Sequence, residues 1–133
     1  MVLHAGNVEK VVRQLVESAI DVSIFVDPDL EQIRQCQKLR APKIEINTGK
    51  YAEAWQRGGN WTAELDKIAT AARAAKKLGL VVLAGHGLTY RNIDGIAAVP
   101  EIEELNIGHA IVARAALVGM DKAVREMIAL LGS

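Results

Sequence analysis

The chain contains very few aromatic residues and a single cysteine. Only 4% of its 133 residues are Phe, Trp or Tyr, while 50% are hydrophobic, so aliphatic side chains and alanine must build the core. The lone Cys36 cannot form an internal disulfide, and no second ligand stands at metal-binding spacing. Neither a disulfide scaffold nor a metal site is therefore predicted. The position of Cys36 beside Ile33 in a helical pattern favours an inert, half-buried thiol.

An excess of charge and a long apolar run are also missing. Sixteen basic residues balance sixteen acidic residues and are scattered along the chain, which argues against binding to nucleic acid or to an anionic membrane. No apolar run approaches the ~20 residues that a membrane span needs. The first ten residues lack the layout of a signal peptide. Together these features predict a soluble protein in a reducing compartment, most simply the cytoplasm.

Helical patterns alternate with short apolar runs. Apolar residues recur at helical spacing near the N-terminus, where Asn7 is predicted to be the N-cap. The segment 27–29, Asp-Pro-Asp, predicts a second helix start with Asp27 as the cap and proline in the first turn. The longest helix is expected over residues 62–78, stopped by Gly79. The apolar stripe of a final helix comprises Val124, Met127, Ile128 and Leu131.

The apolar runs predict four strands, at residues 22–26, 43–47, 80–84 and 104–108. They lack polar-apolar alternation, as expected of parallel strands that are covered on at least one face. Four βα units behind a leading helix, with no Ser/Gly linker, predict a single α/β domain over residues 1–133. A closed (βα)8 barrel needs about eight strands and ~250 residues, so a small open sheet or half of a TIM barrel remains. The polar residues at the strand ends favour the half-barrel.

Those polar residues stand at the carboxyl ends of the strands, where α/β proteins bind ligands. Glu45 lies between Ile44 and Ile46, so its carboxylate points away from both, plausibly into a barrel interior. A buried carboxylate without a partner is unfavourable by several kcal/mol. Glu45 therefore either serves a function or forms a structural ion pair with a basic residue such as Arg114.

Two histidines follow the third and fourth predicted strands. His86 stands between Gly85 and Gly87, which let the backbone turn sharply and expose N–H groups to an anion. Histidine is also the side chain best suited to proton transfer near neutral pH. Gly108 and His109 open a helical pattern, whose free N–H groups form a natural phosphate seat. Either histidine alone would be interpreted as a loop or cap residue; together they predict a site that binds phosphate and moves a proton.

Other chemistry-bearing residues receive structural interpretations. His4, near the free end of the chain, is expected to be exposed. Trp55 and Trp61 flank a glycine-rich excursion and are expected to pack on the longest helix rather than to form a lid. Asp27 is interpreted as a helix cap rather than as an acid catalyst.

Four segments together resemble the pyridoxine 5'-phosphate synthase family in order and spacing. They are residues 22–29, 44–51, 84–92 and 104–111. The resemblance covers nearly the whole chain, and its third and fourth segments are quite specific to the family. It implies the C-terminal half of a (βα)8 barrel that condenses 3-amino-2-oxopropyl phosphate with 1-deoxy-D-xylulose 5-phosphate, giving pyridoxine 5'-phosphate, inorganic phosphate and water.

The resemblance also implies a role for each candidate residue. His86 would be the proton donor of the ring-closing sequence, and Glu45 would stabilise charge that develops in the transition state. Gly87, Gly108 and His109 would hold the phosphate of the amino-ketone substrate. No metal or cofactor is implied.

Two departures from the family pattern qualify this expectation. The family usually has histidine where this chain has Asn47. The family's N-terminal half, with its glutamate base and its sugar-phosphate grip, has no counterpart in these residues. The isolated chain is therefore expected to lack the family's transferase activity.

Two other functions remain open. The first is a non-catalytic half-barrel that binds phosphate and self-associates into a homodimer resembling a whole barrel, because a half-barrel leaves two strand edges unpaired. The second is a nucleotide-binding module, which calls for a glycine-rich fingerprint after the first strand. Residues 27–29 stand there instead, which disfavours this second reading.

Overall fold

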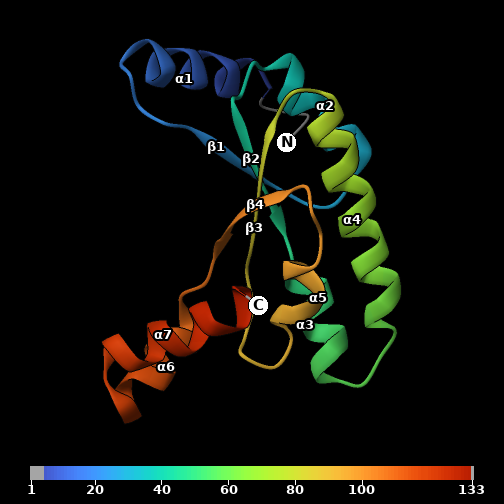
Figure 1. Cartoon of the computed structure of the whole chain (residues 1–133). Helices are drawn as coiled ribbons and strands as arrows, with labels where there is room; N and C mark the ends of the chain where they lie inside the picture. The colour runs from blue at the N-terminus through green and yellow to red at the C-terminus, as the bar shows by residue number, and fades with distance from the viewer. Residues whose placement is uncertain (1–4, 133) are drawn as a thin grey trace.

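The computed structural model describes residues 5–132 as four strands alternating with helices (Figure 1). The predicted α/β fold class, with βα units behind a leading helix, is confirmed. The elements in chain order are α1 (Ala5–Glu17), β1 (Ser23–Val26), α2 (Leu30–Lys38), β2 (Lys43–Asn47), α3 (Gly49–Gln56), α4 (Trp61–Lys77), β3 (Val81–Gly85), α5 (Ile93–Ala97), β4 (Ile102–Asn106), α6 (His109–Val118) and α7 (Met120–Leu131).

The four strands form one parallel sheet in the order β1-β2-β3-β4. A doubly wound sheet reverses its strand order at a switch point, whereas a (βα)8 barrel adds each strand beside the previous one. The sequential order is therefore that of half a TIM barrel. Its edge strands are β1 and β4.

Helices α2 and α4 pack on one face of the sheet (Figure 1). The side chains of that face are aliphatic, and Ile44, Ile46 and Val82 are completely buried. Helix α4 meets them with Ile68 and three alanines, whose small side chains let the helix approach the strands closely. Each buried isoleucine contributes roughly 1.5–3 kcal/mol to stability. The aliphatic and alanine core expected from the composition is thus located between the sheet and these helices.

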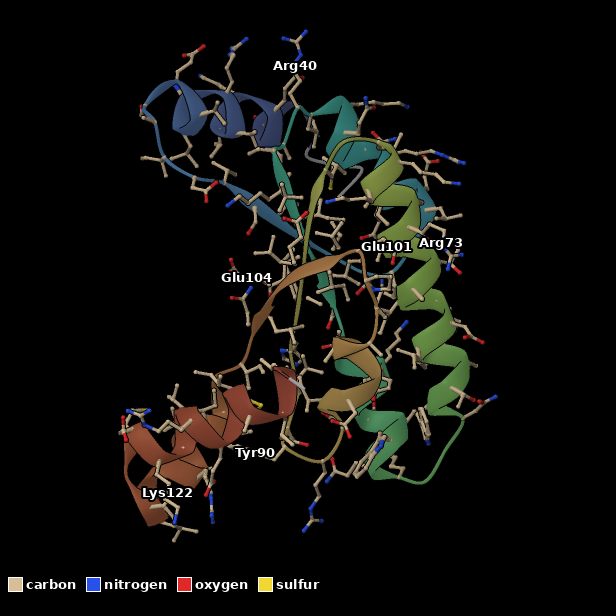
Figure 2. The ribbon with its side chains drawn as sticks, in the orientation of Figure 1. Arg40, Arg73, Tyr90, Glu101, Glu104 and Lys122 are labelled. Atoms are coloured by element: carbon tan, nitrogen blue, oxygen red, sulfur yellow. The ribbon has the colours of Figure 1, made fainter. Side chains whose placement is uncertain are left out.

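The opposite face of the sheet, here called the inner face, carries polar residues. Phe25, Glu45, Leu83 and Glu104 face one another across the four strands in register. A bulge in β4 after Ile102 inserts one extra residue. This places the side chains of Glu104 and Asn106 on the inner face. Figure 2 shows Glu104 projecting from β4 away from α4. This face corresponds to the interior of a closed barrel.

Two predicted helix caps are wrong. Helix α1 runs through Asn7, which lies inside the helix rather than at its start. Asp29, not Asp27, caps α2: it is extended, with φ −127°, and its carboxylate accepts a hydrogen bond of 2.9 Å from the backbone N–H of Gln32. Pro28 consequently precedes the cap instead of occupying the first turn. Asp27 is free to contact another strand end.

The element boundaries otherwise differ little from those predicted. The fourth strand begins at Ile102 and ends at Asn106, two residues earlier than expected, because two glutamates follow Ile102 and interrupt the apolar run. In α7 the predicted stripe is only partly inward: Met127 is buried, whereas Ile128 and Leu131 are exposed. Cys36 is fully buried on α2, more deeply than predicted. None of the helices in the described part of the chain is long and apolar enough to cross a membrane.

Candidate active site

The residues predicted to form a site converge on one cavity of about 730 Å³ at the carboxyl ends of the strands. Its lining includes all five of them: Glu45, His86, Gly87, Gly108 and His109. Phe25, Leu88, Asn106 and Ile107 complete the lining. Residues that are up to 84 positions apart along the chain are thus brought together by the parallel register of the sheet.

Glu45 lies on the inner face and is held by an amide. The Nδ2 atom of Asn106 donates a hydrogen bond of 3.0 Å to the Glu45 carboxylate. The predicted alternative, an ion pair with Arg114, is wrong, because the Arg114 guanidinium binds Glu126 at 2.8 and 3.1 Å. Glu45 forms no ion pair within residues 5–132, so its negative charge remains available to the cavity.

Gly85 provides the space in which this carboxylate lies. A Cβ atom at Gly85 would come within 2.4 Å of Oε1 of Glu45 and within 2.9 Å of the carbonyl oxygen of Asn106. Both distances are too short for non-bonded atoms. A glycine is therefore required at the end of β3 if Glu45 is to lie across that strand.

His86 occupies a left-handed backbone conformation directly after β3. Its φ is +88°, and that of the following Gly87 is +74°. A residue other than glycine in this region is strained by roughly 1–3 kcal/mol and is held there by its surroundings. The imidazole meets Phe25 edge to face, with ring centroids 6.4 Å apart. On its other side it contacts Gly49, where a Cβ atom would lie 2.9 Å from Cδ2 of His86.

The fourth strand end contributes the start of α6. Gly108 is the N-cap and His109 the first helical residue, so the free N–H groups of the first turn lie beside the cavity. The first turn contains no acidic side chain, and the positive end of the helix dipole favours an anion there. The binding of a phosphate group at this helix start stays a prediction.

The other residues that the sequence singled out have structural surroundings of their own. Asp27 accepts a hydrogen bond of 3.1 Å from Nδ2 of Asn47, which links the ends of β1 and β2. Trp55 and Trp61 are half-buried and pack against the core, as predicted. His4 lies outside the described residues. Within residues 5–132, no group of three or more His, Cys, Asp or Glu side chains is arranged to hold a metal ion.

Sequence reasoning missed three site residues, which are Asn106, Thr48 and Asn92. Asn106 binds Glu45, while the other two bind the backbone around His86. Asn106 could have been found, because it is the last residue of β4 and lies two residues after Glu104, so that both side chains point to the same face of the sheet. Thr48 and Asn92 directly precede short helices, where such residues are ordinarily interpreted as caps.

Comparison with known proteins identifies similar chains. The model of the family described as pyridoxal phosphate biosynthesis protein PdxJ matches residues 1–133. The pyridoxine 5'-phosphate synthase of Syntrophotalea carbinolica is 50% identical over 126 residues, which cover 95% of this chain and 52% of that protein. The enzyme of the same name from Geotalea daltonii is 48% identical over 129 residues, with coverages of 95% and 52%. That from a Synechococcus species is 46% identical over 134 residues, with coverages of 98% and 52%. The chain spans about half the length of the curated relatives it matches.

Proposed function

Because the chain belongs to the family of the pyridoxal phosphate biosynthesis protein PdxJ, we propose that it forms half of the active site of a pyridoxine 5'-phosphate synthase. The substrates of the proposed reaction are 3-amino-2-oxopropyl phosphate and 1-deoxy-D-xylulose 5-phosphate. The observation that carries the proposal is the convergence of Glu45, His86 and the Gly108–His109 helix start on one cavity. A carboxylate, an imidazole and an anion seat are the groups that a condensation of phosphorylated amino and keto compounds requires.

In this proposal Glu45 stabilises positive charge. An amine that condenses with a ketone passes through a cationic, iminium-like state, and a fixed carboxylate in a sheltered site lowers the energy of such a state. The single amide partner, Asn106, orients the carboxylate without neutralising it. This supports an electrostatic role rather than a structural ion pair.

His86 is assigned the role of proton donor. Its ring lies in the cavity lining near Phe25 and Gly49, and the residue is exposed. Gly87 on one side, with Gly108 and His109 on the other, line the same cavity and are assigned to the phosphate of the amino ketone. Backbone N–H groups and the dipole of α6 supply the attraction for that phosphate.

The rest of the active site is proposed to come from the βα units that the relatives contain beyond the matched half. Two features of the chain support this. The strands β1 and β4 are the edges of the sheet. Large apolar side chains are exposed mainly on the two flanks that border these edges, where a further half-barrel would cover them. They are Val11, Val16, Ile20 and Phe25 on one flank, and Val112, Leu117, Met120, Ile128 and Leu131 on the other.

Self-association into a barrel-like homodimer is the second candidate, favoured by the same free edges. The charges of the inner face oppose it. Lys43 forms an ion pair with Asp21 and also interacts with Glu104 through its charge. Neither Glu45 nor Glu104 forms an ion pair of its own among residues 5–132. A second copy would bring the same two carboxylates into one enclosed space, where like charges repel strongly. A different half-barrel with basic residues on its inner face is therefore the favoured partner.

Titration with inorganic phosphate tests the proposed function on the chain itself. The NMR signals of the His86 and His109 rings and of the Gly87 and Gly108 amides are expected to shift together and to saturate. Chloride at equal ionic strength is the control and is expected to leave them unchanged. The pure chain is expected to form no pyridoxine 5'-phosphate. Absence of a phosphate response at these residues, or substantial turnover by the chain alone, would contradict the proposal.

A cytoplasmic location stays a prediction, based on the composition.

A further inference from the structure

Two buried polar side chains bind the same short turn of the backbone. Apart from tyrosine, Thr48 and Asn92 are the only polar residues classed as buried in the described part of the chain, with 0% and 4% of their surface exposed. Burying a polar side chain is unfavourable unless it is hydrogen-bonded. Both residues are hydrogen-bonded, and all of these bonds involve the segment 85–89 that contains His86.

Thr48 binds the first part of the turn. Its hydroxyl lies 2.8 Å from the carbonyl oxygen of Gly85 and 2.6 Å from that of His86, and it donates its one proton to either of them. Its backbone N–H also donates to the Gly85 carbonyl, at 2.8 Å. Thr48 precedes α3 as its N-cap, yet its side chain makes no capping hydrogen bond. The hydroxyl is turned away from its own helix and toward the turn.

Asn92 binds the second part of the turn in the same manner. Its Nδ2 atom donates to the Gly87 carbonyl at 3.2 Å, and its Oδ1 atom accepts from the backbone N–H of Thr89 at 2.7 Å. Asn92 is the N-cap of α5 and likewise makes no side-chain capping bond. A side-chain cap stabilises a helix by about 1 kcal/mol, so both helix starts forgo that stabilisation.

Tyr51 fixes Asn92 in turn. Its hydroxyl, almost completely buried, donates to the Asn92 carbonyl at 2.5 Å. Burial, and secondarily the carboxylate of Asp94, raises the pKa of Tyr51, so the hydroxyl remains protonated and able to donate. The three consecutive carbonyls of residues 85–87 thus all lie within hydrogen-bonding distance of Thr48 or Asn92, and Asn92 is itself held by Tyr51.

The turn needs such support because its conformation is strained and its surroundings are tight. His86 has a positive φ. A Cβ atom at Gly87 would come within 2.7 Å of Cβ of Ala52, so the chain passes α3 closely. A relaxed turn would move both the imidazole and the Gly87 N–H by more than the fraction of an ångström that a catalytic site tolerates.

We propose that Thr48 and Asn92 are positioning residues, which hold the His86–Gly87 turn in its left-handed conformation and so fix the imidazole in the cavity. The purpose of this arrangement rests on the proposed function, because a proton donor and a phosphate-binding glycine gain from being fixed before substrate binds. The positioning itself can be tested without activity.

The test compares NMR spectra of variants of the full chain. Thr48→Val removes the hydroxyl at nearly constant shape, and Asn92→Asp removes the donor to Gly87 while keeping the acceptor for Thr89. Both are expected to lose the nuclear Overhauser contacts of the His86 ring with Gly49 and Phe25, and to shift the His86 ring signals. Thr48→Ser keeps the hydroxyl and is expected to retain the contacts. Thr70→Val, on the exposed side of α4, is the matched control.

The proposal is overturned if Thr48→Val and Asn92→Asp fold and keep the His86 contacts and signals of the unchanged chain. If Thr48→Val does not fold, Asn92→Asp and the rescue by Thr48→Ser decide the matter. Phosphate titration separates this inference from the proposed function. A chain that gives no phosphate response contradicts the proposed function, whereas the ring contacts still report on the positioning.

Discussion

At the level of single residues, the site depends on a glycine at position 85, where any side chain would collide with its neighbours. Gly85 has an ordinary backbone conformation, so its φ does not require glycine. What requires it is the space around it, because a Cβ atom there would come within 2.4 Å of Oε1 of Glu45 and within 2.9 Å of the Asn106 carbonyl oxygen. The position of the Glu45 carboxylate therefore depends on the identity of the residue at position 85 on the next strand.

Substitution of Gly85 by alanine is expected to displace Glu45 and to break its hydrogen bond with Asn106. Overpacking of this kind lowers the free energy of unfolding by about 1–3 kcal/mol. Urea denaturation measures the loss. Gly6→Ala is the control, because a Cβ there meets nothing within 4 Å and alanine favours the helix. Equal stability of Gly85→Ala and the unchanged chain would show that the carboxylate does not lie over β3.

The same scale shows what the sequence could and could not predict. Glu45, His86 and His109 were identifiable because their residue types stand at strand ends, where the parallel sheet brings chemistry together. Thr48 and Asn92 were not, because their partners lie across a turn and their positions before helices suggest caps. Asp27 was misassigned for a related reason: two aspartates flank Pro28, and only the backbone angle of Asp29 decides which one caps α2.

At the scale of elements, α6 depends on its neighbour α7. No residue of α6 is buried. The helices α6 and α7 lie together beyond the sheet, away from α4 (Figure 1). Arg114 of α6 binds Glu126 of α7 through two hydrogen bonds. Tyr90 anchors α7 to the loop after β3, because its hydroxyl donates to the Ala123 carbonyl at 2.7 Å (Figure 2). The orientation of the proposed phosphate seat at the start of α6 follows from these contacts.

The Arg114–Glu126 pair is expected to make stability depend on acid pH. The guanidinium of Arg114, through its hydrogen bonds, lowers the pKa of the Glu126 carboxyl below its ordinary value. A lowered folded-state pKa means that the contribution to stability is present above the unfolded pKa of about 4.3 and is lost as the pH falls through the folded one. Glu126→Gln is therefore expected to be less stable than the unchanged chain at neutral pH and to lose less stability on acidification. Urea denaturation at a series of pH values checks this, and an unchanged pH dependence would exclude the pair as its source.

Element boundaries were predictable to the extent that they follow apolar runs. The strands β1, β2 and β3 fall within one residue of the predicted ranges. The strands β1 and β3 are mostly apolar, whereas β2 contains polar residues on either side of Ile44 and Ile46. The strand β4 contains two consecutive glutamates, Glu103 and Glu104, and a bulge, so its start at Ile102 could not be recognised from hydrophobicity alone. The bounds of β4 are set by its pairing with β3, which is a contact between distant parts of the chain.

At the scale of the whole molecule, the inner face decides which partner fits. Glu45 and Glu104 lie on it in register with Leu83 between them. If their repulsion opposes pairing of two copies, Glu45→Gln combined with Glu104→Gln is expected to self-associate more strongly than the unchanged chain. Analytical ultracentrifugation measures the association. The control combines Glu9→Gln with Asp66→Asn, which changes the net charge equally on exposed helix positions. Equal association of both double variants would remove the electrostatic argument against the homodimer.

We propose that this chain supplies one half of a pyridoxine 5'-phosphate synthase active site. The most direct measurement is the formation of pyridoxine 5'-phosphate when the chain is mixed with the unmatched half of the Syntrophotalea carbinolica enzyme, with both phosphorylated substrates present. We expect turnover by the mixture and none by either half. We also expect His86→Ala or Glu45→Gln in this chain to abolish that turnover without preventing assembly. Assembly of a stable complex that is inactive, or whose activity survives both substitutions, would contradict this proposal.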